Sequence, residues 1–362
     1  MGLVMGASGF RHRMIQEIFE EPKAIRDTIR GCSEGLQTVL DEVAAEGFRV
    51  VYLSGSGTSY YASLAGQYAM STLTSLTATA VPASELSSWV SPTARDFLLI
   101  AFSQSGESVD VLSAAKTALR MGGKVFAVTN EPRSALAKMA NFVLLTRAGR
   151  ELAVTATKTY VSQLAAIYLL SIELSGIQKV KSEVELDELR KGLKEAPRLA
   201  EETLTSTDKV VRELAEKYRH NKFFFILGSG PNYTTALEGA LKLKESCNVF
   251  AEGYASREFL HGPMRLVDEN TPMIFITPPD KALSEHLDLI ERFRRLGAPI
   301  ITVSGGDEKI VELGNSIIIS RGLPPAFTPM IYVGPLHLFA YYSSITRGLN
   351  PDKPEKITKV VK

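Results

Sequence analysis

Two short loops rich in serine, threonine and glycine carry the residue types that bind an anion. Each loop follows a run of apolar residues and precedes a helical stretch. The loops are Gly55-Ser56-Gly57-Thr58-Ser59 and Ser103-Gln104-Ser105-Gly106-Glu107-Ser108. Free N–H groups at a helix start and the helix dipole favour a dianionic phosphate, and hydroxyl groups add neutral donors. Serine and threonine are also ordinary N-caps, but two such loops at adjacent strand ends favour a phosphate site.

The same loops do not match the glycine-rich motifs of nucleotide-binding proteins. Tyr60 stands where the G-x-G-x-x-G motif requires its third glycine, and no Walker lysine follows either loop. The sequence therefore disfavours NAD and ATP, and we expect no cofactor.

A predicted helix in the second half carries a further group of ionisable side chains. Glu238, Leu241, Lys242 and Glu245 have the spacing i, i+3, i+4 and i+7, which places them on one helix face. A solvated face of ion pairs has the same spacing, so the pattern leaves a structural and a functional interpretation open. His261 follows in the sequence before Gly-Pro, and an imidazole near a carboxylate can exchange protons at neutral pH.

The elements that position these residues are short apolar runs separated by amphipathic stretches. The runs cover residues 49–53, 97–102, 125–128 and 142–145 in the first half and 223–227, 273–276, 300–303 and 317–319 in the second. Continuous apolar runs indicate strands buried on both faces of a parallel sheet, and helical stretches between them indicate βαβ units.

The two halves repeat one pattern, since a Gly-Ser-Gly turn follows the first strand of each. We therefore predict an α/β protein with two tandem doubly wound parallel-sheet domains of the flavodoxin-like kind. The expected parts are N-terminal helices in 1–47, a phosphate-binding domain in 48–178, a helical connection in 179–205, a second domain in 206–347 and a tail in 348–362. The second half has Pro278 and Pro279 in the loop that corresponds to Ser103–Ser108, and proline has no N–H to donate. Only the first domain is thus expected to hold a phosphate.

The composition narrows the class of protein. Of 362 residues, 41 are Lys or Arg and 40 are Asp or Glu, so the net charge of +1 gives no sign of a nucleic-acid partner. The two cysteines, Cys32 and Cys247, lie far apart, which predicts no disulfide and a reducing, cytoplasmic location. The five histidines fall in no metal-ligand spacing, so we expect no metal site. No start typical of a secretory signal and no run of about 20 apolar residues is apparent, so we expect no membrane partner.

Together these motifs resemble the sugar isomerase (SIS) family, and within it the isomerase half of glucosamine-6-phosphate synthase. The resemblance runs along nearly the whole chain. It includes the segments 12–22, 57–59, 103–108, 157–158, 238–245 and 261–263 and the tail as far as Lys359.

The resemblance implies roles for individual residues. The loop residues that match the family's ligands of the 6-phosphate and nearby hydroxyls are Thr58, Ser59, Ser103, Gln104, Ser105 and Ser108, and Thr155 lies in a further substrate-binding segment. Glu245 matches the base that moves a proton between C1 and C2, and Lys242 lines the same site. His261 matches the residue that opens the sugar ring from a neighbouring subunit, which implies a homodimer. Lys359 matches the tail lysine that forms a Schiff base with the ketose, so the tail is expected to be catalytic.

The sequence also departs from the family pattern. The synthase has an N-terminal glutaminase domain that begins with a nucleophilic cysteine, and no segment here matches it. We therefore expect free ammonia as the partner of the sugar phosphate. Thr155-Ala156 stands where Ala-Ser is usual, and Leu260 stands where lysine often precedes the histidine. These positions leave the exact sugar and amine open.

The expected function is an enzyme that interconverts glucosamine 6-phosphate with fructose 6-phosphate and ammonia. Three alternatives stay open: an isomerase domain cut from or partnered with a full synthase, another aldose–ketose phosphate isomerase or a deglycase, and a sugar-phosphate sensor. A sensor needs only the phosphate loops, so the presence of Glu245, His261 and Lys359 favours an enzyme.

Overall fold

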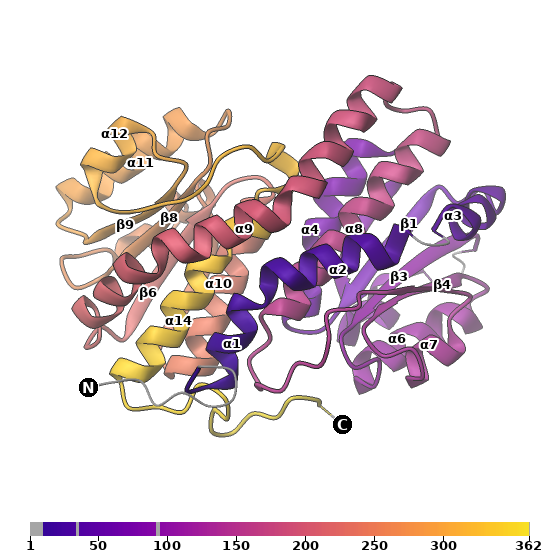
Figure 1. Cartoon of the computed structure of the whole chain (residues 1–362), viewed down its shortest axis with the longest axis horizontal. Helices are drawn as coiled ribbons and strands as arrows, with labels where there is room; N and C mark the ends of the chain where they lie inside the picture. The colour runs from indigo at the N-terminus through magenta and orange to yellow at the C-terminus, as the bar shows by residue number, and fades with distance from the viewer. Residues whose placement is uncertain (1–9, 34–35, 92–94, 362) are drawn as a thin grey trace. The chain divides into compact units, whose positions relative to one another are not determined.

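The computed structural model describes residues 10–33, 36–91 and 95–361. The chain divides into two compact units (Figure 1). We call one the first-sheet unit, which contains residues 21–151, 158–197 and 358–362, and the other the second-sheet unit, which contains residues 1–20, 152–157 and 198–357. Each unit holds a five-stranded parallel sheet.

The first sheet has the strand order β2-β1-β3-β4-β5. Its strands are β1 (Val50–Gly55), β2 (Thr77–Pro82), β3 (Phe97–Ser103), β4 (Lys124–Thr129) and β5 (Phe142–Leu145). Every residue of the central strand β3 is buried, as expected for a strand covered on both faces. The strand order reverses between β1 and β3, and ligands of open α/β sheets bind at such a reversal, beyond the carboxyl ends of the strands.

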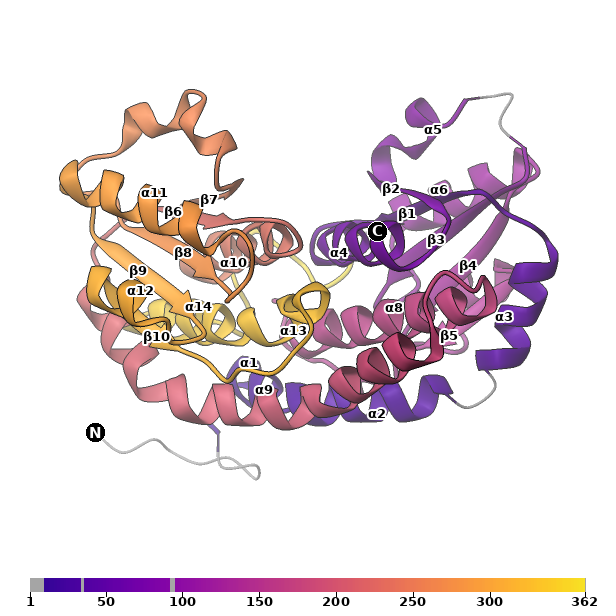
Figure 2. The ribbon, with the colours of Figure 1, turned by 90° about the horizontal axis from the view of Figure 1, so that it is seen from above.

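Helices cover both faces of the first sheet (Figure 2). The helices of this unit are α2 (Glu21–Ser33), α3 (Leu36–Ala45), α4 (Thr58–Leu73), α5 (Leu86–Trp89), α6 (Val109–Arg120), α7 (Ala135–Met139) and α8 (Lys158–Ile177), with the short 3-10 helix η1 (Ala83–Glu85). On one face, Leu99 and Ala101 of β3 share a core with Val111 and Ala115 of α6. On the other face α4 packs against β1 and β2, and α8 packs against α4 and α2.

The helix α8 is long and apolar enough to pass as a membrane span by length and composition alone. The sequence analysis is wrong on this point, because it finds no such run. However, 83% of the helix's most apolar window is buried inside the structure, where α8 packs against α2 and α4. Its apolar side chains are therefore accounted for as core.

The second sheet repeats the first, with the order β10-β9-β8-β6-β7. Its strands are β6 (Phe223–Gly228), β7 (Phe250–Ala255), β8 (Met273–Thr277), β9 (Ile300–Ser304) and β10 (Asn315–Ile318). Counted from the start of each sheet, both orders read 2-1-3-4-5, which is the flavodoxin-like order. This confirms the prediction of two tandem doubly wound α/β domains.

Helices also cover both faces of the second sheet. The helices of this unit are α1 (Arg13–Phe19), α10 (Asn232–Cys247), α11 (Leu283–Arg295), α12 (Glu308–Leu313), α13 (Pro329–Tyr332) and α14 (Gly334–Thr346), with the 3-10 helices η2 (Glu258–Leu260), η3 (Pro263–Leu266) and η4 (Pro325–Phe327). The helix α10 packs on β6 and β7 and against α14. On the opposite face, Phe275 of β8 shares a core with Phe293 of α11 and Ile310 of α12.

The segment between the two sheets is the 35-residue helix α9 (Glu183–Lys217), which contains Pro197. The two units divide between Pro197 and Arg198, inside this helix. The helix α1 belongs to the second-sheet unit, and the last residues, from Thr358, belong to the first-sheet unit.

Both cysteines are free thiols in the core. Cys32 Sγ donates to Leu145 O at 3.3 Å and Cys247 Sγ donates to Ala340 O at 3.1 Å. Burial raises the pKa of Cys32 to about 12 and that of Cys247 to about 11. Since the thiolate is the reactive form, both cysteines are structural.

His286 of α11 makes the stability of the second-sheet unit depend on pH. Its Nε2 atom lies 3.0 Å from Ser229 Oγ and 2.9 Å from Ser256 Oγ, and burial lowers its pKa to about 4. The unfolded chain takes up a proton near the ordinary pKa of 6.5, while the folded chain does so only near 4. The free energy of unfolding should therefore fall as pH drops from about 6.5 to 4, by about 3 kcal/mol from this residue.

The His286→Gln variant tests this expectation. Urea unfolding at pH 7 and at pH 4.5 should show a weaker pH dependence in the variant than in the unmodified chain. His220→Gln is the matched control, because His220 is exposed. An equal pH dependence in the His286→Gln variant and the unmodified chain would contradict the assignment.

Candidate active site

The two serine-rich loops follow neighbouring strands of the first sheet. Strand β1 pairs with β3, and Ser54 is opposite Ala101 close to the carboxyl ends of both strands. The loops therefore lie at the same edge of the sheet, at the point where the strand order reverses.

The first loop is a tight strand-to-helix turn. A Cβ atom at Gly55 would lie 2.6 Å from the backbone carbon of Ser59, so only glycine fits there. Gly57 has a φ of 54°, a left-handed conformation that favours glycine. Together they bring the first turn of α4, with Thr58 and Ser59, directly onto the end of β1. Ser59 Oγ is held in place by Gln163 of α8, whose Nε2 atom donates to it at 3.0 Å.

The second loop is organised by its own serines. Gly106 N donates to Ser103 Oγ at 3.0 Å, and Glu107 N donates to Ser105 Oγ at 3.2 Å. Gln104 O accepts a hydrogen bond from Asn130 N at 3.1 Å, which ties the loop to the end of β4. Ser108 is the N-cap of α6, yet its side chain makes no capping hydrogen bond. Simple capping therefore does not explain the serine at this position.

The Gly106→Ala variant tests whether this loop geometry matters for binding. Gly106 has a φ of 63°, and an added Cβ would lie 2.1 Å from Ser134 Oγ. The loop would have to shift, and we expect the affinity for fructose 6-phosphate to fall at least about tenfold, roughly the value of one hydrogen bond. Gly122→Ala is the matched control, since Gly122 has a φ of 82° but its Cβ would meet only Arg95 Cδ, at 3.5 Å. Calorimetric titration of both variants gives the comparison; equal affinities would contradict the expectation.

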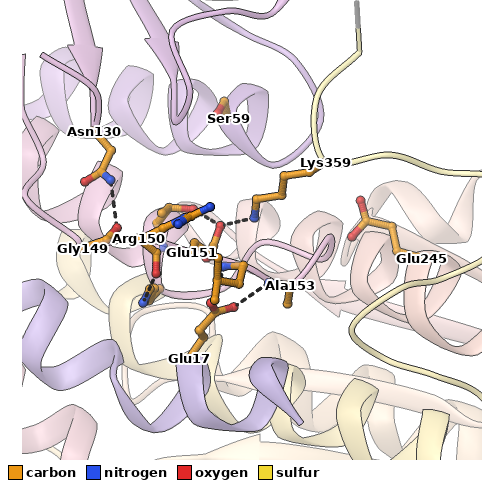
Figure 3. Close-up of polar contacts among 12 residues, drawn as sticks. Glu17, Ser59, Asn130, Gly149, Arg150, Glu151, Ala153, Glu245 and Lys359 are labelled. Atoms are coloured by element: carbon orange, nitrogen blue, oxygen red, sulfur yellow. Dashed lines mark hydrogen bonds and ion pairs between the residues drawn. The ribbon is translucent and has the colours of Figure 1, made fainter. Parts of the chain in front are cut away.

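Lys359 of the tail is ion-paired within the first-sheet unit. Its Nζ atom lies 2.5 Å from Oε2 of Glu151, whose side chain is fully buried (Figure 3). The same carboxylate accepts hydrogen bonds from Thr159 N at 3.2 Å and Thr159 Oγ1 at 2.7 Å. Because Thr159 lies in the first turn of α8, the negative charge is placed at a helix N-terminus, where the helix dipole stabilises it.

The segment before Glu151 is fixed by Asn130. Asn130 Nδ2 donates to Gly149 O at 2.9 Å, and Asn130 Oδ1 accepts from Ala148 N at 2.7 Å (Figure 3). Lys158 is buried and its Nζ atom donates to Arg150 O at 2.8 Å. The backbone that leads to Glu151 is therefore held on both sides, which fixes where the carboxylate points.

In the second-sheet unit, the ionisable residues of α10 form a buried network. Lys242 Nζ lies 2.6 Å from Glu245 Oε2 and 3.3 Å from Glu238 Oε1, and the side chains of Lys242 and Glu238 are fully buried. His337 of α14 lies 3.8 Å from Glu238 Oε1. The face shared by these residues is therefore packed inside the unit and is not a solvated surface of ion pairs.

The charges of this network stabilise one another. Burial alone would lower the pKa of Lys242, but the carboxylates of Glu238 and Glu245 outweigh it and hold the pKa above its ordinary value. Lys242 is thus an ammonium between two carboxylates. Glu245 is the partly exposed member, with 24% of its side chain accessible, so it is the one that a substrate can reach.

Glu245 lines a cavity of the second-sheet unit. The cavity has a volume of about 480 Å³ and lies between the end of α10 and the tail residues 348–350 and 353–357. The start of this tail is anchored, because Asp352 accepts hydrogen bonds from Arg13 N at 3.0 Å and Met14 N at 2.8 Å. Glu245 therefore lines a space of ligand size.

Thr155 lies in a segment held from two sides within the second-sheet unit. Ala153 N donates to Glu17 Oε2 at 3.2 Å (Figure 3). Val154 N donates to Asp352 O at 3.1 Å. Thr155 itself is fully buried, and among the described residues its hydroxyl has no hydrogen-bond partner.

His261 lies apart from these networks. It ends the turn η2, its backbone N donates to Glu258 O at 3.0 Å, and its side chain is exposed. No group of three His, Cys, Asp or Glu side chains suited to a metal occurs in the part of the chain that the structure describes.

The structure thus gathers the predicted residues into separate groups. Within the first-sheet unit, hydrogen bonds connect the segments that contain Ser59, Ser103 and Lys359 to α8 or to the end of β4. Glu245 and Lys242 form their own pair in the second-sheet unit. The sequence analysis missed Glu151, Gln163 and His337. One feature of the sequence could have drawn attention to Glu151, since no other Asp or Glu occurs between Glu131 and Glu173.

Two doubly wound α/β units related by duplication define the class of protein. The model of the SIS domain family matches residues 47–173 and 217–347. The chain belongs to this family, which confirms the resemblance seen in its motifs.

Relatives of known sequence extend the match beyond the two domains. The chain is 37% identical, over 98% of its length, to a glutamine–fructose-6-phosphate aminotransferase (isomerizing) of Thermococcus kodakarensis. It spans 58% of that relative's length.

Two solved structures resemble the fold closely. The C-terminal domain of glucosamine-fructose-6-phosphate aminotransferase from Francisella tularensis has a TM-score of 0.88 and 26% identity, over 96% of this chain and 100% of that one. A glucosamine-6-phosphate deaminase from Thermotoga maritima has a TM-score of 0.80 and 23% identity, over 96% of this chain and 99% of that one. The second match shows the fold alone.

Proposed function

We propose that this chain is an enzyme that interconverts glucosamine 6-phosphate with fructose 6-phosphate and free ammonia. The observation that carries the proposal is the ion pair of Lys359 with the buried Glu151 in the unit that also holds the serine-rich loops. It supplies an amine in the same unit as the predicted phosphate site. The names of the relatives, which are aminotransferases of fructose 6-phosphate, support the same substrate.

In this proposal the loops bind the phosphate and orient the sugar. Thr58, Ser59, Ser103, Gln104, Ser105 and Ser108 supply the side chains, and α4 and α6 supply N–H groups at their first turns. Thr155, with its buried hydroxyl, is a further candidate for binding the sugar. Hydroxyls and N–H groups hold a dianion without adding charges that would compete with the reaction.

The chemistry is assigned to Lys359 and Glu245. The amine of Lys359 condenses with the C2 carbonyl of fructose 6-phosphate, and the resulting iminium acidifies the proton on C1. The carboxylate of Glu245 moves that proton between C1 and C2. Lys242 Nζ lies 2.6 Å from Glu245 Oε2, so Lys242 holds the carboxylate of the base in place.

We also propose a homodimer in which His261 opens the sugar ring in the partner's site. The exposed position of His261 on a turn is compatible with action outside its own subunit. Sedimentation of the active protein should show a dimer, and full activity in a monomer would contradict this assignment.

The nitrogen source and the location are proposals as well. Ammonia is proposed as the nitrogen partner because it is the amine released when glucosamine 6-phosphate is converted to fructose 6-phosphate. A cytoplasmic location fits the two buried free thiols.

One incubation tests the function. The protein with glucosamine 6-phosphate should release ammonia and fructose 6-phosphate in equal amounts, and with fructose 6-phosphate and an ammonium salt it should form glucosamine 6-phosphate. Interconversion of glucose 6-phosphate and fructose 6-phosphate without ammonia release would favour a plain isomerase. Binding of the sugar phosphates without any turnover would favour a sensor.

A further inference from the structure

Glu151 has a geometry that suits more than a structural ion pair. Its carboxylate is fully buried, and Thr159 binds both of its oxygen atoms, Oε1 through the backbone N at 3.2 Å and Oε2 through Oγ1 at 2.7 Å. The Nζ atom of Lys359 lies 2.5 Å from Oε2, and 24% of the lysine side chain is accessible to solvent. The carboxylate is thus fixed, and the amine is both held and open to a ligand.

The helix α8 links this pair to the phosphate loops. Thr159 and Gln163 are four residues apart on α8, so they lie on one face about 5–6 Å from each other. Thr159 binds Glu151, and Gln163 Nε2 donates to Ser59 Oγ at 3.0 Å. One turn of α8 therefore separates Thr159, which binds the partner of Lys359, from Gln163, which binds the loop after β1. This spacing is on the scale of the carbon chain between the phosphate and C2 of a hexose phosphate.

We propose that Glu151 is the positioning residue of Lys359, which holds its Nζ atom for attack on the sugar carbonyl and receives its proton beforehand. This inference rests on the proposed function, in which Lys359 forms a Schiff base. An ammonium has no lone pair, so it must lose a proton before it attacks. A buried carboxylate at hydrogen-bond distance can accept that proton without exchange with water.

The protons balance in this step. One proton of the Lys359 ammonium passes to Glu151, and the free amine adds to C2 of the ketose. A second proton of the nitrogen moves to the former carbonyl oxygen, which gives a carbinolamine. Glu151 then returns its proton to this oxygen, the C–O bond breaks, and water leaves. The product is an iminium with one N–H, next to a carboxylate that is ionised again.

The pH dependence of Schiff-base formation distinguishes this role from a structural one. With Glu151 present, the ammonium–carboxylate pair is itself the reactive form, so the rate should vary little between pH 6 and 8. With glutamine at this position the amine must lose its proton to water, and at the ordinary lysine pKa of about 10.4 only about one lysine in 2,500 is neutral at pH 7. We expect Glu151→Gln to trap fructose 6-phosphate on Lys359 about 100-fold more slowly at pH 7, with a rate that rises with pH.

The experiment follows the mass of the Lys359 peptide after incubation with fructose 6-phosphate and cyanoborohydride. The unmodified chain, Glu151→Gln, Glu151→Asp and the matched control Glu131→Gln are compared from pH 6 to 8, since Glu131 is an exposed carboxylate of the same unit. Glu151→Asp keeps a carboxylate, so it should keep the flat pH profile at a lower rate. Glu131→Gln should behave like the unmodified chain.

The outcomes separate the two proposals. If the unmodified chain traps no adduct on Lys359, the proposed function is wrong whatever Glu151 does. If it traps the adduct, and Glu151→Gln does so at the same rate and with the same pH profile, the role of Glu151 is overturned. Should Glu151→Gln fail to fold, a steep pH profile in Glu151→Asp would overturn it instead.

Discussion

Replacing Glu245 by glutamine is expected to slow the interconversion of the two sugar phosphates by about 100- to 10,000-fold, the usual contribution of a positioned acid or base. Glutamine keeps the shape of the side chain, and its amide oxygen can still accept the hydrogen bond from Lys242 Nζ, now 2.6 Å away. It cannot carry a proton between C1 and C2. Turnover should therefore be lost while binding of fructose 6-phosphate stays the same, which a coupled assay and a calorimetric titration measure.

The matched control for this variant is Glu252→Gln. Glu252 also pairs with a lysine, since Lys244 Nζ lies 3.7 Å from its Oε1, but both side chains are exposed. Its replacement should leave turnover unchanged. If Glu245→Gln retained more than about a tenth of the activity, which corresponds to a barrier change below about 1.4 kcal/mol, Glu245 would not be the proton shuttle.

The sequence predicted the central strands well because they are buried on both faces. All eight predicted apolar runs became strands, and β5 has the expected bounds of Phe142–Leu145. The two strands it missed are β2 and β7, which lie at the edges of their sheets. Only part of β2 is buried, so its sequence Thr77–Pro82 needs no continuous apolar run. Hydrophobic patterning detects an edge strand poorly for this reason.

Some features of the candidate site follow from neighbouring residues in the sequence, and others depend on contacts between residues far apart in the chain. The serine-rich loops were predictable, because a strand end, a glycine and hydroxyl residues follow one another in the sequence. The partner of Lys359 was not predictable from spacing, since Glu151 is separated from it by 208 residues. No periodicity reports such a contact. Only the fold brings the two residues together.

The face of α10 shows why spacing alone left two interpretations open. Glu238, Lys242 and Glu245 would have the same i, i+4 and i+7 positions on a solvated helix. What decides between them is burial, and α10 packs against β6, β7 and α14. On a buried helix face, water cannot solvate a charge that has lost its partner. The stability of each charged residue on this face therefore depends on the other two.

That dependence gives the largest expected effect on stability. The variant Lys242→Met removes the ammonium between two carboxylates and leaves the fully buried Glu238 without its nearest cation. Breaking a buried ion pair by removing one partner costs about 3–5 kcal/mol, and urea unfolding should show a loss of this size. The matched control is Lys244→Met on the same helix, where the lysine side chain is 38% accessible and pairs only with an exposed carboxylate; it should cost less than about 1 kcal/mol.

A double variant separates charge from packing. Methionine nearly matches the length of the lysine stem, so the loss in Lys242→Met should come from the uncompensated charge of Glu238 and not from a cavity. Adding Glu238→Gln removes that charge, and the double variant Lys242→Met/Glu238→Gln should recover most of the lost free energy of unfolding. The sum of the two single losses would be expected only if the residues acted independently. Additive losses would therefore show that Lys242 stabilises the fold by its packing, and that the buried charges of α10 are not coupled.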